Sequence, residues 1–233
     1  MTRRRCLLAC TAAAAGVTGA AAAGPPAEAI SWAKLRTPTQ TTGPEASWRL
    51  NKGALESIPG ARRQCDLWTV AEYESFDFSF GWKVAPGANT GIKYLIQASA
   101  VDRLRDRQGE FLHETSLGYE FQLVDDASPA GQADLHASGA LYNYLAPTER
   151  AARKASEWNT GRLVLKGDGV EHWLNGRRVL AYRLGSAPLL TALAAKQLGS
   201  ARLMERLAQR RSPVVLQHHE SQVWFRHLRI AAL

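Results

Sequence analysis

The chain has 233 residues, with 29 lysines and arginines against 21 aspartates and glutamates, and a formal net charge of +8 at pH 7. Charges of both signs are scattered along it, which is typical of a solvated surface and does not single out nucleic acid as a partner. Once residues 1–29 are set aside, Cys65 is the single cysteine left, which excludes an intramolecular disulfide, so the fold must rest on its core.

The N-terminus has the layout of an export signal. Three arginines, residues 3–5, precede an uncharged run of small apolar residues, and Ala27-Glu28-Ala29 offers a small-x-small cleavage site. The arginines also resemble a twin-arginine signal. We therefore expect residues 1–29 to be removed and the protein to be exported, to the periplasm or beyond. A lipid anchor at Cys10 is the weaker alternative. No stable membrane span is expected, because the run is poor in Leu, Ile and Phe.

The rest of the chain has the pattern of a β protein. Residues 30–47 read as a linker or extended lead-in, and the folded domain is expected over residues 48–233. The clearest strand is 76–84, where aromatic and aliphatic residues alternate with polar ones. Asn175-Gly176, flanked by two alternating segments, predicts a hairpin with a type I′ turn. Further strands are expected at 92–98, 118–124, 140–144, 158–166, 170–174, 178–183, 214–218 and 223–230.

Short strands that recur about every ten residues predict a sandwich or barrel of antiparallel sheets. Residues 188–211 are the exception, because leucines interspersed with Lys and Arg suit an amphipathic helix there. Gly199-Ser200 in the middle favours two packed helical pieces.

Seven short motifs follow one another along the chain. They are Asp66-Leu67-Trp68-Thr69, the segment Pro86 to Tyr94, the segment Gly118 to Asp126, Gly139-Ala140-Leu141-Tyr142, Glu157-Trp158-Asn159, Glu171 to Gly176, and Leu216-Gln217-His218-His219 with Val223 to Arg226. Together they resemble the 3-keto-disaccharide hydrolase domain family over about residues 48–231. The resemblance implies a mainly β fold, a concanavalin A-like jelly-roll sandwich of two antiparallel sheets with a short helical insertion near 188–211. It also implies a concave face that binds carbohydrate.

The resemblance further implies that the substrates of this family are glycosides already oxidised at C3. A ketone at C3 acidifies the C2 hydrogen, so a base can remove it and the glycosidic oxygen leaves C1 by elimination, after which water adds back. The reaction needs a base, an acid for the leaving oxygen and a group that polarises the ketone, but no pair of carboxylates. A separate sugar 3-dehydrogenase is implied as a functional partner.

Glu120 and Gln122 lie two residues apart on one predicted strand and therefore share a face. We expect Glu120 to act as acid or base and Gln122 to bind a hydroxyl. The alternative is that Glu120 is a solvated residue on an outer sheet face. Asp125 matches the same motif and is expected to contact substrate, whereas turn formation is the expected role of Asp126.

Gln217 and His219 share a face of a late strand. Gln217 is expected to bind substrate, and a histidine there can serve as base or as metal ligand. A divalent metal would need further ligands from Glu120, Glu171 or His113, and no other cofactor is indicated. The family usually carries an acid or amide at the position of His218 and a glycine at that of Glu220. These departures put the family's chemistry in question for this chain.

The remaining candidates lie near the hairpin and in flanking strands. Glu171 and Trp173 share one hairpin face, and an acid beside an indole is a common way to hold a sugar. With Glu120 and His219, Glu171 completes the candidate catalytic residues. Lys93 is expected to polarise a ketone, with a purely structural role as the alternative. Arg226 is expected to bind a hydroxyl or carboxylate, with a surface salt bridge as the alternative. Tyr142, Trp173 and Trp224 are candidate stacking surfaces, with ordinary core packing as the alternative.

Two other functions compete with the enzyme. A jelly-roll concavity can bind glycans without cleaving them, which would make the domain a non-catalytic carbohydrate-binding module. An envelope protein that binds polymers through its basic surface would instead associate in a salt-sensitive way. Loss of activity in a Glu120→Gln variant that still binds sugar distinguishes the enzyme from both.

Overall fold

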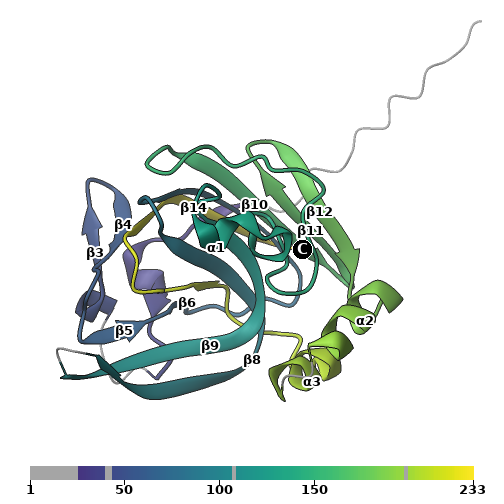
Figure 1. Cartoon of the computed structure of the whole chain (residues 1–233), viewed down its shortest axis with the longest axis horizontal. Coiled ribbons are helices and arrows are strands. Elements are labelled where there is room, and N and C mark those ends of the chain that lie inside the picture. Colours follow the sequence, from purple (N-terminus) through teal and green to yellow (C-terminus); the bar gives the residue numbers. More distant parts are fainter. Residues whose placement is uncertain (1–25, 40–43, 107–108, 197–198) are drawn as a thin grey trace, which may run out of the picture.

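The computed structural model describes residues 26–39, 44–106, 109–196 and 199–233, so the expected export signal lies almost wholly outside the described residues. The described strands form two sheets packed face to face (Figure 1). This confirms the predicted fold class, a mainly β sandwich with few helices. No helix in the described ranges is long and apolar enough to cross a membrane.

The first sheet, called sheet A, has eight strands among the described residues. Its order is β12 (Arg177–Arg183), β11 (Gly169–Leu174), β10 (Asn159–Lys166), β7 (Phe76–Val84), β14 (Val223–Ala232), β4 (Ala54–Ser57) and β3 (Trp48–Asn51), with β1 (Glu28–Ala29) paired to β14. The predicted hairpin is confirmed: Asn175 and Gly176 have φ values of 49° and 82°, the left-handed conformation of a type I′ turn.

The second sheet, sheet B, has six described strands. Its order is β2 (Leu35–Arg36), β6 (Leu67–Thr69), β13 (Val215–Leu216), β8 (Asn89–Asp106), β9 (Gly109–Val124) and β5 (Arg63–Cys65). The pairings in both sheets are antiparallel except that of β5 with β9. The expected lead-in, residues 30–47, contains β2 and the buried Leu35, so part of it packs on the sandwich.

The helices occupy the edges of the sandwich. They are α1 (Pro129–Gln132), α2 (Ala187–Ala195) and α3 (Gly199–Arg206), with 3-10 turns at Trp32–Lys34, Pro44–Ala46 and Asp134–His136. Figure 1 shows α2 and α3 at one end, beside β8 and β9, where the Tyr119 hydroxyl donates to the Met204 carbonyl at 3.2 Å. Two helical pieces in this region were predicted from the sequence.

Alternation decides which side chains enter the core. Phe76, Phe78, Phe80, Trp82 and Val84 of β7 are all buried between the sheets, as their spacing predicts. In the middle of the core, Phe121 of β9 stacks on His172 of β11, with ring centroids 4.2 Å apart and planes within 2°. Residues on either side of Phe121 therefore face outward from sheet B, and residues on either side of His172 face outward from sheet A.

One predicted strand is wrong. Residues 140–144 form a turn in which Asn143 has φ 69°, and Leu141 makes isolated bridges to Phe121 and Leu145. The segment runs along the edge of β9 for two residues and then turns back, so its apolar pattern comes from burial against the strand and not from a strand of its own.

Candidate functional site

The outer face of sheet B gathers the polar residues of three strands around Glu120. Lys93 of β8 is paired with Glu120 of β9, and Gly91 is paired with Gln122. A side chain at Gly91 would collide with the Glu120 carboxyl group, so the absence of a Cβ lets this carboxyl lie over the strand. Gln217 approaches from the other side of β8, where its backbone N–H donates to the Gly91 carbonyl at 3.0 Å.

Glu120 has the most informative electrostatics of the site. Its carboxyl is half-buried, and burial raises its pKa to about 7, while Lys93 lowers the pKa and Asp66 raises it. A carboxyl group with a pKa near 7 is found in both protonation states at neutral pH. Glu120 can therefore accept a proton and donate it again.

Lys93 belongs to a buried ion pair. Its Nζ donates to Asp66 Oδ2 at 3.1 Å and to Thr115 Oγ1 at 3.0 Å. Asp66 also accepts the backbone N–H groups of Ser116 at 3.0 Å and His218 at 2.9 Å. An ammonium has three donors, so after these two bonds one N–H of Lys93 is left for another acceptor.

Two glutamine amides flank the Glu120 carboxyl. Gln217 Nε2 lies 3.4 Å from Glu120 Oε2, and Gln122 Nε2 donates to Asn89 Oδ1 at 2.9 Å. The Oε1 atoms of both glutamines are buried and have no hydrogen-bond partner within the described part of the chain. Buried acceptors without a donor are rare in folded proteins, so these two oxygens distinguish the surroundings of Glu120 on this face.

The segment 139–142 covers the edge of β9 beside the site. Three backbone hydrogen bonds join the segment to β9. The N–H of Gly139 donates to the Gln122 carbonyl at 2.9 Å, the backbone N–H of Gln122 donates to the Ala140 carbonyl at 3.1 Å, and the backbone N–H of Tyr142 donates to the Glu120 carbonyl at 2.9 Å. These bonds bring Tyr142 next to Glu120. Burial, and then the Glu120 charge, raise the pKa of Tyr142.

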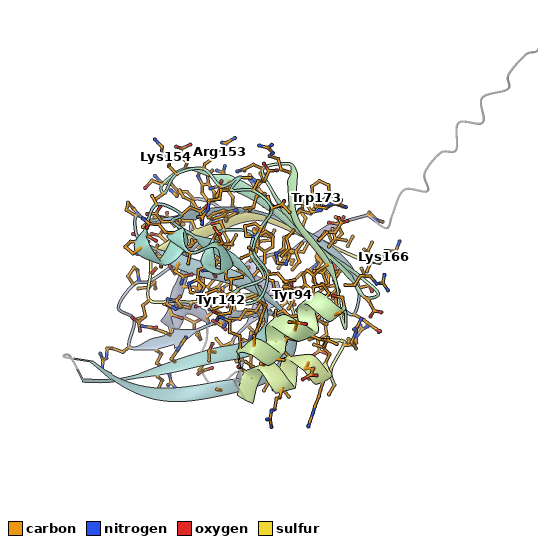
Figure 2. All side chains as sticks on the ribbon, turned by 45° about the vertical axis from the view of Figure 1, so that its right-hand side comes forward. Tyr94, Tyr142, Arg153, Lys154, Lys166 and Trp173 are labelled. Atoms are coloured by element: carbon orange, nitrogen blue, oxygen red, sulfur yellow. The ribbon has the colours of Figure 1, made fainter. Side chains whose placement is uncertain are left out.

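Four of the expected residues thus come together with Glu120: Gln122, Lys93, Gln217 and Tyr142. Three others do not, because Glu171, Trp173 and Arg226 point from the outer face of sheet A. The expectation that Glu171 and Glu120 serve one site is wrong, since the Phe121 and His172 rings between them put the two carboxylates on opposite sides of the sandwich. Figure 2 shows Trp173 and Arg153 along the upper side of the molecule and Tyr142 below them.

Glu171 is held by its own neighbours. Its carboxylate accepts the Trp173 indole N–H at 2.9 Å and an Arg178 N–H at 2.9 Å. The acid and the indole that were expected to hold a sugar together are therefore hydrogen-bonded to each other.

The carboxylate of Asp125 binds backbone N–H groups of two turns. Its carboxylate accepts the N–H groups of Gly87 at 2.9 Å and Ala127 at 3.1 Å, which ties together two turns. The structure therefore shows a structural role for Asp125, and its contact with substrate stays a prediction.

The two histidines of the late motif differ. His218 is buried edge-on against Trp48, with ring centroids 5.4 Å apart, and burial lowers its pKa to about 4. His219 is exposed. Within the described residues, no three His, Cys, Asp or Glu side chains lie close enough together to hold a metal ion.

The sequence reasoning missed three residues of this face: Asp66, Asn89 and Gly91. Asp66 is the first residue of the first motif and directly precedes the buried Leu67. Acidic residues are rarely buried unless they are paired, so this position could have indicated a buried ion pair. Asn89 and Gly91 lie in the second motif, but nothing in their spacing indicates a role in the site. Here they begin β8, where Asn89 binds Gln122 and Gly91 makes room for Glu120.

Comparisons with solved structures show the class of fold. A candidate glycosyl hydrolase from Parabacteroides distasonis superimposes with a TM-score of 0.69 at 22% identity, over 86% of this chain and 89% of that chain. A second from the same organism gives 0.59 at 21% identity, over 86% and 94%. The fold is therefore that of a sandwich also found in candidate glycosyl hydrolases.

The family follows from the sequence. Residues 31–231 match the 3-keto-alpha-glucoside-1,2-lyase-like domain, and the chain belongs to this family. It is also 26% identical over 182 residues to a 3-keto-disaccharide hydrolase of Bacteroides thetaiotaomicron, an alignment that covers 72% of this chain and 62% of that protein. The chain thus spans less than two-thirds of that relative. The resemblance carried by the seven motifs is confirmed.

Proposed function

We propose that this protein cleaves 3-keto-glycosides on the outer face of sheet B, by elimination followed by hydration. The observation that carries the proposal is the half-buried Glu120, whose pKa is raised to about 7 beside two amide oxygens that lack donors. The relative's name, 3-keto-disaccharide hydrolase, supports the same substrate class.

In the proposed reaction, the Glu120 carboxylate takes the proton from C2 of the 3-keto sugar. The C–H electron pair forms the C1–C2 double bond as the bond from C1 to the glycosidic oxygen breaks. The Glu120 carboxylic acid then gives the proton to the departing oxygen. Water adds across the double bond, its hydroxyl to C1 and a proton to C2, which yields the free 3-keto sugar and the released alcohol.

The neighbours of Glu120 have distinct roles in this scheme. The Lys93 ammonium, which Asp66 holds in place at 3.1 Å, stabilises negative charge that develops at the C3 oxygen. Gln122 and Gln217 bind sugar hydroxyls in this scheme. Tyr142 closes the side of the site along the 139–142 segment.

The test compares two glutamates of the same protein. The purified protein is mixed with 4-nitrophenyl 3-keto-glucosides of both anomers and with their unoxidised parents, and release of nitrophenol is followed. Activity is expected on a keto substrate alone. Glu120→Gln should lower kcat by about 10³-fold, since general acid–base catalysis contributes about 10²–10⁴-fold, and the matched Glu171→Gln should keep activity within about threefold.

Two results contradict the proposal. Equal activity of wild type and Glu120→Gln would remove Glu120 from the mechanism. Binding of the keto sugar without any cleavage would instead favour the non-catalytic carbohydrate-binding module, since the same amides hold a sugar whether or not it is cut.

A further inference from the structure

The outer face of sheet A contains a hollow that the proposed reaction does not use. Its volume is about 460 Å³, and its lining includes Arg153, Arg226 and Arg229 together with Trp158 and the amides Asn159 and Asn175, but no aspartate or glutamate. In the described part of the chain, none of the three arginines forms an ion pair. A concave site of this size with convergent donors is suited to a small anionic ligand.

A β-bulge puts two of these arginines on one face. The pairing of β14 with β7 shifts register between Arg226 and Arg229, so Arg226 lies opposite Gly81 and Arg229 opposite Ser79. His227, within the bulge, has the left-handed φ of 52°. Without the extra residue, alternation would send residues 226 and 229 to opposite sides of the sheet. The small residues opposite them leave space above β7.

The arginines stacked on indoles of this sheet differ in their partners. Arg162 and Arg178 lie 5.6 and 5.9 Å from the Trp173 ring centroid, and each also binds a carboxylate, Asp77 or Glu171. Arg226 lies closer to its indole, 3.8 Å from the Trp158 centroid, and has no acidic partner among the described residues. Stacking holds a guanidinium flat and leaves its in-plane N–H donors free for a carboxylate.

A second hollow of about 350 Å³ continues the first. The two share Ser79, Thr160 and Gly161 in their linings, and the second is bounded by Trp173 and Arg162. An elongated ligand can therefore pass from the Trp158 ring to the Trp173 ring. Both indoles are half-buried, and the part of each ring that stays exposed beside its stacked cations offers apolar contact to sugar C–H bonds.

We propose that this surface of sheet A binds an acidic oligosaccharide, with a uronic acid carboxylate on Arg226 and Arg229 and the sugar chain running beside Trp158 and Trp173, whose rings already carry stacked cations. A polyphosphate chain fits less well, because the carboxylates of Asp77 and Glu171 lie on the same face and would repel closely spaced charges. This site is independent of Glu120 and would hold the protein on an acidic polysaccharide.

The test uses tetragalacturonate, with maltotetraose as a neutral probe, and isothermal titration calorimetry at low and moderate salt. Arg226→Gln combined with Arg229→Gln should weaken tetragalacturonate binding about tenfold or more, because hydrogen bonds to charged groups are lost. The matched control removes two exposed arginines of α3, Arg202→Gln combined with Arg206→Gln, and should bind as wild type does. Thermal unfolding checks that both double variants are folded.

Arg226→Lys decides the case if the first double variant does not fold. It keeps the charge but loses the planar donor pair, so a fitted carboxylate site predicts weaker binding. Wild-type affinity in Arg226→Lys, or an equal loss in both double variants, would mean diffuse charge attraction and overturn the proposal. So would equal binding of maltotetraose, tighter binding of a single-stranded oligonucleotide, or no binding of tetragalacturonate.

Discussion

The two outer faces of this sandwich use charge in opposite ways. On sheet B, Lys93 and Asp66 are almost fully buried, with side chains 6% and 0% exposed, and they meet the half-buried Glu120. On sheet A, Arg162 and Asp77 form the same kind of pair with side chains 45% and 29% exposed. Coulomb interactions are screened by water on the second face and much less on the first. The comparison teaches that acid–base chemistry follows burial and not the number of charges.

The largest expected effect is on the buried ion pair. Asp66→Asn leaves the Lys93 ammonium uncompensated in the protein and should lower the free energy of unfolding by about 3–5 kcal/mol. The same change on the other face, Asp77→Asn, should cost about 1 kcal/mol or less, because exposed pairs contribute little. Urea unfolding monitored by tryptophan fluorescence measures both. Equal losses in the two variants would show that the faces do not differ in screening.

The next effect concerns pH. The pKa of Glu120 is about 7 in the folded protein against an ordinary value of 4.5, so between these pH values the folded state binds more protons than the unfolded chain. The free energy of unfolding should therefore fall as pH rises through this window, by at most about 3 kcal/mol.

Glu120→Gln removes this dependence. The variant should be more stable than wild type at pH 8 and close to it at pH 4.5, whereas Glu171→Gln should follow the wild-type curve. Unfolding by urea at both pH values is the measurement. A Glu120→Gln variant that is less stable at pH 8 would contradict the raised pKa.

The smallest effect is expected for the substitution of Gly91, and it concerns catalytic activity. Gly91→Ala places a methyl group where the Glu120 carboxyl lies, and the displaced base should lower kcat/KM by about 10²-fold, the effect of a misplacement of about 1 Å. Gly169→Ala, in which the new Cβ meets only ordinary contacts, is the control. Activity on the keto substrate separates the two. If Gly91→Ala keeps full activity, the position of Glu120 over Gly91 is not needed.

Much of the sandwich could be predicted because its signals are local. The strand at 76–84 follows from alternation, and the hairpin from Asn175-Gly176, whose two left-handed residues favour this pair. The short strands β3 to β6 were not predicted, since three or four residues carry too little periodicity to recognise.

The candidate site could be predicted only in part. Glu120 and Gln122 share a strand, so their common face follows from spacing alone. Whether Glu171 shares that face depends on which sheet each strand joins, and pairing between strands far apart in sequence leaves no local signal. Asp66 was not identified for the same reason, because it contacts Lys93 and the backbone N–H of His218, which are distant in sequence.

The short segment 139–142 has a consequence for how the base is held. With β8 bonded on one side and this segment on the other, the backbone of Glu120 has no free edge. The carboxyl group can then move only by rotation about its own side-chain bonds. The backbone entropy of the proposed base is therefore lost when the chain folds, and only its side-chain rotations remain to be restricted when a sugar arrives.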